Sequence, residues 1–324
     1  ALRSALGLWG SRERDARAAR SMSAPSTSPA AEWARRGERG SLPLLRFMVW
    51  LSLTAGRAPT RVLLRLIAAY FLAFGGAATR ASRAYLERCL GRAPTLAEQY
   101  RLFFNFAATV HDRVYFLKDR FDLFSIEVHG DKLFDAGGAV LLGAHMGSFE
   151  VMRACGRTLS HRRVAIAMYE DNARKINAVL TAIAPEAAQD IVALGRLQSM
   201  LELGERLDAG VLVGVLADRT FGDEAVIQVP FLGAPAPFPP GPMRMAAALR
   251  QRVYFMAGLY LGGNRYEVHF EPLADFRGLD GVDRAERDRQ VEEAVHAYAA
   301  RLEHYVRLAP MLWFNFHDFW AQRP

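Results

Sequence analysis

The amino-acid sequence predicts an α/β fold with a mostly parallel central sheet flanked by helices, preceded by an N-terminal membrane-associating helical hairpin. The first observation is a series of short, uncharged apolar runs, typical of buried strands, at 138–143, 164–168, 191–194 and 211–216. The second is helical patterning between these runs, at about 148–159, 171–183 and 196–208. Strands that alternate with helices along a chain usually form a parallel sheet covered by helices. The third is a pair of apolar segments near the N-terminus that arginines flank.

The N-terminal segment, residues 1–41, precedes the expected fold. It is rich in Ala, Arg, Ser and Pro, and it holds no apolar run of the roughly 7–15 residues that a secretory signal requires. We expect this segment to be disordered. The remainder, 42–324, is expected to form one domain, because no internal repeat and no second-domain linker is visible.

The hairpin comprises two apolar segments, 43–55 and 61–78, separated by Gly56–Pro59. The uncharged core of the second segment, Leu66–Ala78, is shorter than the roughly 20 residues that cross a bilayer. Its flanks carry Arg57, Arg61, Arg65, Arg80 and Arg83. This pattern favours helices of region 42–80 that lie in the membrane interface, with arginines reaching the headgroups. A hairpin buried against the domain and a tilted spanning helix are the alternatives.

A helical pattern continues over 81–117 and is broken around Gly91–Pro94. Thr95-Leu-Ala-Glu98 fits a capping box that opens the second of these helices. Within it, His111-Asp112-Arg113 is expected to form a local ion pair. The remaining expected elements are a hairpin of strands at 253–261 and 265–270 and a charged helix at about 285–308.

Composition narrows the classes of function. The 324 residues are 51% hydrophobic and 23% charged, the balance of an ordinary globular domain. A net charge of +7 suits nucleic acid, anionic lipid headgroups or an acidic carrier protein. Scattered arginines without a recognisable module argue against nucleic acid. Cys89 and Cys155 lack zinc or disulfide spacing, and neither a metal-binding helix signature nor a nucleotide-binding glycine loop occurs, so no metal or cofactor is expected.

The candidate site follows the expected strand at 138–143 directly. His145 should lie at the carboxyl end of that strand, where α/β sheets bind ligands. Gly147 permits a tight turn, Ser148 suits a helix N-cap, and Glu150 falls in the first helical turn. A carboxylate beside an imidazole fixes its tautomer and raises its basicity, as a general base requires. Free N–H groups around Gly147 and Ser148 are candidates to stabilise an oxyanion. Taken alone, the pair is weak evidence for catalysis, and a capped helix with a satisfied histidine explains it better.

Three blocks of sequence carry a resemblance to a known family. Gly143-Ala-His-Met-Gly-Ser-Phe-Glu150, after its apolar strand, resembles the His-x4-Asp/Glu signature of the lysophospholipid acyltransferase superfamily. It is most similar to the branch that contains the late acyltransferases of bacterial lipid A biosynthesis. The blocks similar to that branch further along are Ala217-Asp-Arg219, followed by Val229-Pro-Phe-Leu-Gly-Ala-Pro235, and then Trp313-Phe-Asn-Phe-His317. Their order and spacing match over about 42–324, which would therefore be an acyltransferase domain.

The resemblance implies direct transfer of an acyl chain from a thioester, on acyl carrier protein or coenzyme A, to a hydroxyl or amine of a lipid or glycolipid acceptor. His145 would take the acceptor's proton and Glu150 would orient it. Substrate binding would fall to Gly147, Ser148, Asp218 and Arg219. No cofactor is implied beyond the thioester substrate. The implied location is the cytoplasmic face of a bacterial inner membrane, as a peripheral or monotopic protein.

The chain departs from the pattern of the lipid A enzymes at several positions. It carries Ser148-Phe149 where they usually have Asn-Trp, and Asp218-Arg219 where they have Asp-Gln. The closing block, 315–320, is not an arginine-rich tail. These differences leave the acceptor open. Two other classes of function remain as alternatives, a non-catalytic lipid-binding or assembly protein on an acyltransferase shell and a thioesterase-like hydrolase.

Three further features each have two interpretations. Arg219 is placed either to pair with a phosphate or carboxylate, or to form an ion pair with Asp223 or Glu224. The proline-rich stretch 231–242 is either the wall of an acyl pocket or a rigid structural crossover. The aromatic residues around His317-Asp318 either line an acyl tunnel or belong to the core.

Overall fold

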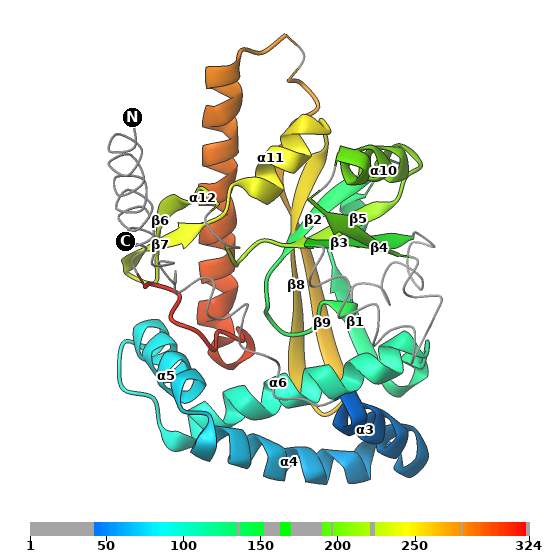
Figure 1. Ribbon diagram of the computed structural model, residues 1–324, viewed down its shortest axis with the longest axis vertical. Coiled ribbons are helices and arrows are strands. Elements are labelled where there is room, and N and C mark those ends of the chain that lie inside the picture. The colour runs from blue at the N-terminus through cyan, green and yellow to red at the C-terminus, as the bar shows by residue number, and fades with distance from the viewer. Residues whose placement is uncertain are drawn as a thin grey trace, which may run out of the picture. The chain divides into compact units, whose positions relative to one another are not determined.

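A seven-stranded sheet lies at the centre of the computed structural model, in the order β1-β9-β8-β2-β5-β3-β4 (Figure 1). The structure describes residues 42–134, 137–151, 163–169, 190–195, 197–220, 224–279 and 281–321. The strands are β1 (Ser125–His129), β2 (Ala139–Gly143), β3 (Val164–Tyr169), β4 (Ile191–Leu194), β5 (Leu212–Leu216), β8 (Arg252–Gly262) and β9 (Arg265–Asp275). Neighbouring strands from β8 to β4 pair in parallel, and only the β8–β9 pair of this sheet is antiparallel among the described residues. The mostly parallel sheet that the sequence predicts is therefore confirmed.

The expected elements that fall on described residues agree closely with the structure. The four apolar runs form β2, β3, β4 and β5, and the expected hairpin forms β8 and β9. Two expected helices are α10 (Leu197–Asp208), which packs against β4 and β5, and α12 (Arg284–Leu308), which packs against β8 and β9. The helix expected at 171–183, most of that at 148–159, Cys155 and the segment 1–41 lie outside the described residues.

Two regions of strand were not predicted. β1 alternates exposed and half-buried residues and lacks the uncharged apolar run of the central strands. The proline-rich stretch forms a separate antiparallel pair, β6 (Ile227–Phe231) and β7 (Ala234–Phe238), followed by α11 (Gly241–Ala248). Prolines are tolerated here because each strand of a two-stranded ribbon has a free edge that needs no N–H donor. The turn uses two residues with positive φ, Leu232 at 50° and Gly233 at 82°, which match the twist of a tight hairpin.

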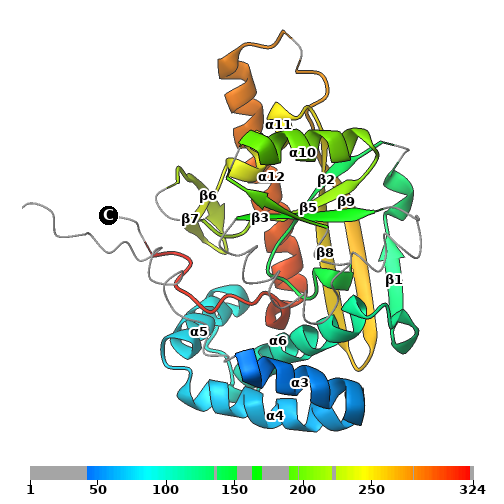
Figure 2. The same cartoon turned by 45° about the vertical axis from the view of Figure 1, so that its right-hand side comes forward.

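Four helices form a layer beside the sheet: α3 (Leu42–Ala55), α4 (Arg57–Phe74), α5 (Ala77–Leu90) and α6 (Leu96–Leu117). Both views show α3 and α4 lying along α6 (Figures 1 and 2). The predicted capping box opens α6, since Thr95 Oγ1 accepts from Glu98 N at 3.2 Å and the Glu98 carboxylate accepts from Thr95 N at 2.7 Å. No described helix is by itself long and apolar enough to cross a membrane; α4 and α5, bent by 91° between them, pass that test only as a pair.

Two opposite faces of α4 carry apolar residues. Thr60, Leu64 and Ala68 are buried against the protein, at the four-residue spacing of one helix face. A second stripe at the same spacing, about 200° around the helix, is exposed. Its members and their exposed fractions are Val62 (57%), Leu66 (68%), Tyr70 (60%) and Phe74 (68%). A surface helix of a soluble domain normally presents polar residues outward, so this stripe forms an unusual apolar surface.

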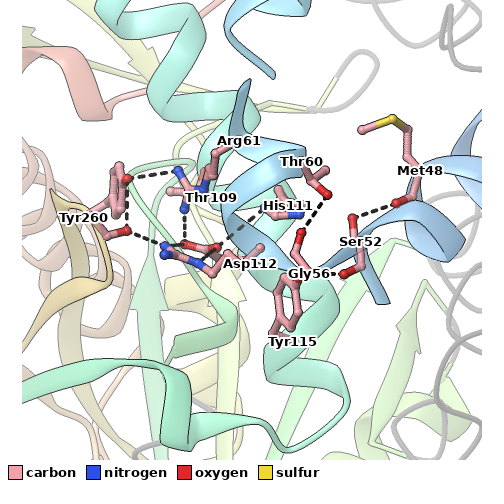
Figure 3. Close-up of polar contacts among 12 residues, drawn as sticks. Met48, Ser52, Gly56, Thr60, Arg61, Thr109, His111, Asp112, Tyr115 and Tyr260 are labelled. Atoms are coloured by element: carbon pink, nitrogen blue, oxygen red, sulfur yellow. Dashed lines mark hydrogen bonds and ion pairs between the residues drawn. The ribbon is translucent and has the colours of Figure 1, made fainter. Parts of the chain in front are cut away.

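Asp112, in the middle of α6, fixes α4 to the rest of the domain (Figure 3). Its fully buried carboxylate accepts from Arg57 Nε at 2.8 Å and Nη2 at 2.9 Å, from Arg61 Nη2 at 2.5 Å, and from the Tyr266 hydroxyl at 2.7 Å. The expected local partner is His111, whose Nδ1 lies 3.8 Å from Asp112 Oδ1, but the shorter ion pairs of Asp112 are with Arg57 and Arg61. Burial lowers the pKa of His111 to about 4, so this neighbour is neutral, and the charges that Asp112 attracts come from another helix. Arg57 and Arg61, two of the five arginines that flank the apolar segment, are therefore structural anchors.

Candidate active site

His145 and Asp218 meet because their strands are neighbours in the sheet. β2 and β5 pair in parallel, with Gly143 opposite Leu216. His145 lies two residues beyond Gly143, and Asp218 lies two residues beyond Leu216. The register therefore brings the two side chains together at the carboxyl ends of adjacent strands, where α/β sheets bind ligands. The predicted position of His145 is confirmed.

Three hydrogen bonds converge on the Asp218 carboxylate, whose residue is 1% exposed. Its Oδ1 lies 2.8 Å from Nδ1 of His145, and its Oδ2 accepts from the His145 backbone N at 3.0 Å. Oδ2 also accepts from Nε1 of Trp313 at 2.9 Å. Because an ionised carboxylate only accepts, Nδ1 of a neutral His145 carries the proton, and Nε2 holds the lone pair that a general base needs.

The protonation states follow from the surroundings of the pair. Burial opposes ionisation of Asp218, but the charge and hydrogen bond of His145, the nearby Arg219 and the Trp313 hydrogen bond outweigh it, so the pKa of Asp218 lies well below its ordinary value. Burial and then Arg219 lower the pKa of His145, and Asp218 only partly offsets them. At neutral pH the site therefore holds an anionic aspartate and a neutral imidazole.

The loop that carries His145 is clamped between β8 and the C-terminal segment. Phe314 N donates to the His145 carbonyl at 2.8 Å, and Gly147 N donates to Leu312 O at 2.8 Å. Gly147 has a φ of 59°, and a Cβ at this position would lie 1.9 Å from the carbonyl oxygen of Gly258. Only glycine fits so close to the neighbouring backbone. Gly147 thus has a steric role in positioning His145.

The N–H groups expected to stabilise an oxyanion are already occupied. Gly147 N donates to Leu312 O, and Ser148 N donates to Gly258 O, both at 2.8 Å. The prediction of an oxyanion site on these two groups was therefore wrong, because the C-terminal segment uses the first donor and β8 uses the second. The Ser148 hydroxyl and the Asn315 Nδ2 are buried beside this loop and have no hydrogen-bond partner among the described residues.

Glu150 lies at the start of the helix that follows the loop and pairs with Arg113 of α6, Nε to Oε1 at 2.7 Å. Its negative charge raises the pKa of His145, the smallest of the influences on that ring. The hydrogen-bond partner of Nδ1, however, is Asp218. The orienting contact predicted for Glu150 is thus made by Asp218. Glu150 instead forms an ion pair with Arg113.

Arg219 and His317 complete the polar surroundings of His145. Arg219 Nη2 donates to Phe314 O at 3.1 Å, which ties the end of β5 to the C-terminal segment. Of its two possible acidic partners, Asp223 lies outside the described residues. Burial, followed by Arg219, lowers the pKa of His317 to about 4, so this ring is neutral at physiological pH.

An aromatic wall borders the site on the side of α6. We define it as Phe103, Phe106, Phe314 and Phe316. Phe106 contacts Phe314 and Phe316 with ring centroids 5.2 Å apart in each case, and Phe103 contacts Phe316 at 5.0 Å. Phe314 is the residue whose N–H binds the His145 carbonyl, and Phe106 remains 41% exposed. The wall therefore presents an apolar surface beside the loop that carries His145.

Three members of the site were not predicted. They are Arg113, Asn315, and Trp313 in its role as a hydrogen-bond partner of Asp218. Trp313 is 1% exposed and packs edge-on against Tyr85 at 4.9 Å, so its ring is part of the core as expected of an aromatic cluster. Its indole N–H nevertheless faces a carboxylate 95 residues away in sequence. The available signal was the requirement that a buried Trp N–H finds an acceptor.

A family model assigns the chain to a protein family. A family model described as bacterial lipid A biosynthesis acyltransferase matches residues 44–322, which include every residue of the site. Among solved structures, 1-acyl-sn-glycerophosphate (LPA) acyltransferase, PlsC, from Thermotoga maritima is similar to the chain. The two share 17% identity with a TM-score of 0.36, over 75% of this chain and 97% of that chain. No curated protein sequence matches the chain.

Proposed function

The chain belongs to the bacterial lipid A biosynthesis acyltransferase family, and from that premise we propose that it moves a fatty acyl chain from a thioester to a hydroxyl or amine of a lipid or glycolipid acceptor. The donor is acyl carrier protein or coenzyme A. The observation that carries the proposal is the pairing of His145 with the buried Asp218 at the ends of two adjacent parallel strands, with Nδ1 and Oδ1 2.8 Å apart.

His145 acts as the general base. Its Nε2 takes the proton of the acceptor as the acceptor oxygen or nitrogen attacks the thioester carbonyl carbon. The tetrahedral intermediate then breaks its carbon–sulfur bond, and the departing thiolate receives the proton from His145. The products are an ester or amide and a free thiol, and the enzyme returns to its starting state without an acyl-enzyme.

Asp218 performs the orienting role, and Glu150 supports it from a distance. A carboxylate on Nδ1 fixes the tautomer that leaves Nε2 free and stabilises the imidazolium formed during transfer. Glu150 adds negative charge near that imidazolium while it pairs with Arg113. Both carboxylates therefore favour the charged form of His145, the first by direct contact and the second through its charge.

Arg219 supplies the positive charge of the site. Its guanidinium is half-buried and close enough to lower the pKa of His145. We assign it to a phosphate or to the developing oxyanion of the substrates, since a guanidinium offers several donors in a fixed plane. Gly147 and Ser148 contribute the shape of the loop, and their backbone N–H groups are not used for binding.

The aromatic wall binds the acyl chain. Phe106, partly exposed, and Phe316 form an apolar surface next to Phe314, which contacts the His145 loop. A fatty chain gains about 0.8 kcal/mol for each methylene that it buries on such a surface. The acyl carbonyl at the end of the chain would then lie beside Nε2 of His145.

We place the protein on the cytoplasmic face of a bacterial inner membrane, with the exposed stripe of α4 in the interface. This stripe, Val62, Leu66, Tyr70 and Phe74, is apolar over about three helical turns. Trp50 of α3 is 60% exposed in the same helical layer, and tryptophan is enriched at membrane interfaces. A lipid acceptor would reach the site from that surface.

The test is consumption of an acyl thioester with and without a membrane-lipid extract, for the wild type, His145→Ala and His296→Ala. His296 is an exposed histidine of α12 and serves as the control. Lipid-dependent turnover that His145→Ala abolishes and His296→Ala retains supports the proposal, and the labelled lipid identifies the acceptor. Equal turnover without lipid indicates a hydrolase. Inertness of the wild type with both donors favours a lipid-binding protein.

A further inference from the structure

We propose that His129, Glu267 and His269 form a binding site for a zinc-class divalent cation at the edge of the central sheet. The three side chains offer two imidazoles and one carboxylate, and one ligand atom from each lies within 4.8 Å of the other two. Imidazole and carboxylate together are ligands that zinc and its neighbours in the first transition row prefer. This site is separate from the His145 site and does not depend on the proposed acyl transfer.

Strand register brings the ligands together. β1 pairs in parallel with β9, and His129 lies directly opposite His269. Glu267 precedes His269 by two residues, so all three side chains point to the same face of the sheet. The two imidazole rings stack with centroids 4.6 Å apart and planes 19° from parallel. Two histidines in register on adjacent strands therefore present their nitrogens side by side.

The carboxylate of Glu267 contacts the ring of His269, with Oε2 3.5 Å from Nε2. For ligand bonds of about 2.0–2.2 Å, the edge of a zinc tetrahedron is roughly 3.4 Å. This ligand–ligand edge thus already has the length that a bound cation requires. The Nε2 of His129 lies 3.4 Å from Oε1 of Glu127, a neighbour on β1. Because 45% of the His129 side chain is exposed, its ring can turn from Glu127 to complete the other two edges, which are at most 4.8 Å long.

The surroundings of the His269 ring give the most specific indication that it binds a metal ion. Its Nε2 is buried and makes no hydrogen bond of good geometry to a described residue, although Oε2 of Glu267 lies 3.5 Å away and buried imidazole nitrogens are normally satisfied. Tyr305 of α12 packs against the ring at 5.3 Å and holds it in place. Tyr305 and Arg301 also bind Glu271, the next acidic residue on this face, so Glu267 is the carboxylate of β9 that faces His269.

The position in the fold indicates what the cation does. β1 is the edge strand, and β9 is its only neighbour in the sheet among the described residues (Figure 2). A cation held by His129 on β1 and by the other two ligands on β9 would cross-link the edge strand to the sheet. Because the ligands come together only in the folded chain, binding of the metal stabilises the fold.

The experiment is titration of the chelator-treated full chain with Zn²⁺, by calorimetry and by competition with a chromophoric zinc indicator. The variants are His129→Ala, Glu267→Gln and His269→Ala, with His296→Ala as the matched control, since it also removes one histidine from the surface of the chain. We expect one zinc per chain in the wild type and the control, and a loss of affinity of at least tenfold in each ligand variant.

Two further measurements report the ligands and the role. Co²⁺ bound in place of zinc should give visible absorption bands typical of few-coordinate nitrogen and oxygen ligation, absent from His129→Ala. Zinc should raise the Tm of the wild type and leave that of His129→Ala unchanged, a variant that folds because this side chain is exposed. Equal zinc binding by the wild type and the three ligand variants, or no zinc binding by the wild type, would overturn the proposal.

Discussion

Trp313 Nε1 donates a hydrogen bond of 2.9 Å to Oδ2 of Asp218, the carboxylate whose other oxygen holds Nδ1 of His145. The indole comes from the C-terminal segment, the aspartate from the end of β5, and the histidine from the loop after β2. A residue that packs in the core thereby fixes the rotamer of the carboxylate that holds Nδ1 of His145. The hydrogen bond connects the stability of the fold to the geometry of the site.

Trp313→Phe should keep the fold and slow the reaction. Phenylalanine retains the edge-on contacts with Tyr85 and Phe319 but removes the hydrogen bond to Asp218. A hydrogen bond to a charged group contributes about 1.5–3 kcal/mol, so we expect kcat to fall roughly tenfold or more. The measurement is steady-state thioester turnover together with Tm. An unchanged kcat with a lower Tm would show that Trp313 serves packing alone.

The two carboxylates of the site should differ in their importance. In Asp218→Asn the partner of Nδ1 loses its charge and no longer enforces the tautomer, and we expect kcat to fall by about 10²–10⁴-fold. Glu150→Gln breaks the ion pair with Arg113 but leaves the Nδ1 contact intact, so its effect should be under about tenfold. Single-turnover transfer rates of the two variants provide the test. The reverse ranking would return the orienting role to Glu150.

The pH dependence of kcat/KM should respond to Arg219. Activity requires neutral His145 and is lost as the pH falls through its pKa. Since burial and Arg219 hold this pKa below its ordinary value of 6.5, the acidic limb of the wild type should lie below pH 6.5. Arg219→Gln removes the positive charge that lowers the pKa, so its acidic limb should move to higher pH. Arg284→Gln, which alters a side chain that is 94% exposed, should leave the limb in place.

Sequence patterns predicted the sheet well because central parallel strands are uncharged and buried on both faces. The same reasoning missed β1, an edge strand with alternating exposure, and the ribbon of β6 and β7, where prolines concealed the strands. In the site, His145 was predicted from its place after a strand. The partner of His145 was not, because nearness in sequence favoured Glu150, whereas the register of β2 and β5 brings Asp218 to Nδ1. Strand order is a long-range property that periodicity does not contain.

Asp112→Asn should destabilise the fold strongly. It leaves Arg57 and Arg61, which are 19% and 12% exposed, without their buried counter-charge. Removal of one partner of a buried ion pair costs about 3–5 kcal/mol of unfolding free energy. Asp122→Asn is the control, because its pair with Arg120 is exposed on both sides and should contribute nothing measurable. Chemical denaturation checks both variants. Equal unfolding midpoints would mean that Asp112 does not anchor α4.

The exposed stripe of α4 should determine membrane binding. Leu66→Glu combined with Tyr70→Glu places two charges on a face where both residues are at least 60% exposed, so the fold should persist. Each buried apolar side chain is worth about 1.5–3 kcal/mol, and the double variant should therefore bind vesicles of bacterial phospholipid at least tenfold more weakly. Leu201→Glu on α10 is the matched control, since Leu201 is 57% exposed on a helix outside the layer formed by α3 to α6. If cosedimentation with vesicles is equal for the wild type and the double variant, α4 does not contact the bilayer, and the lipid acceptor must reach His145 by another route.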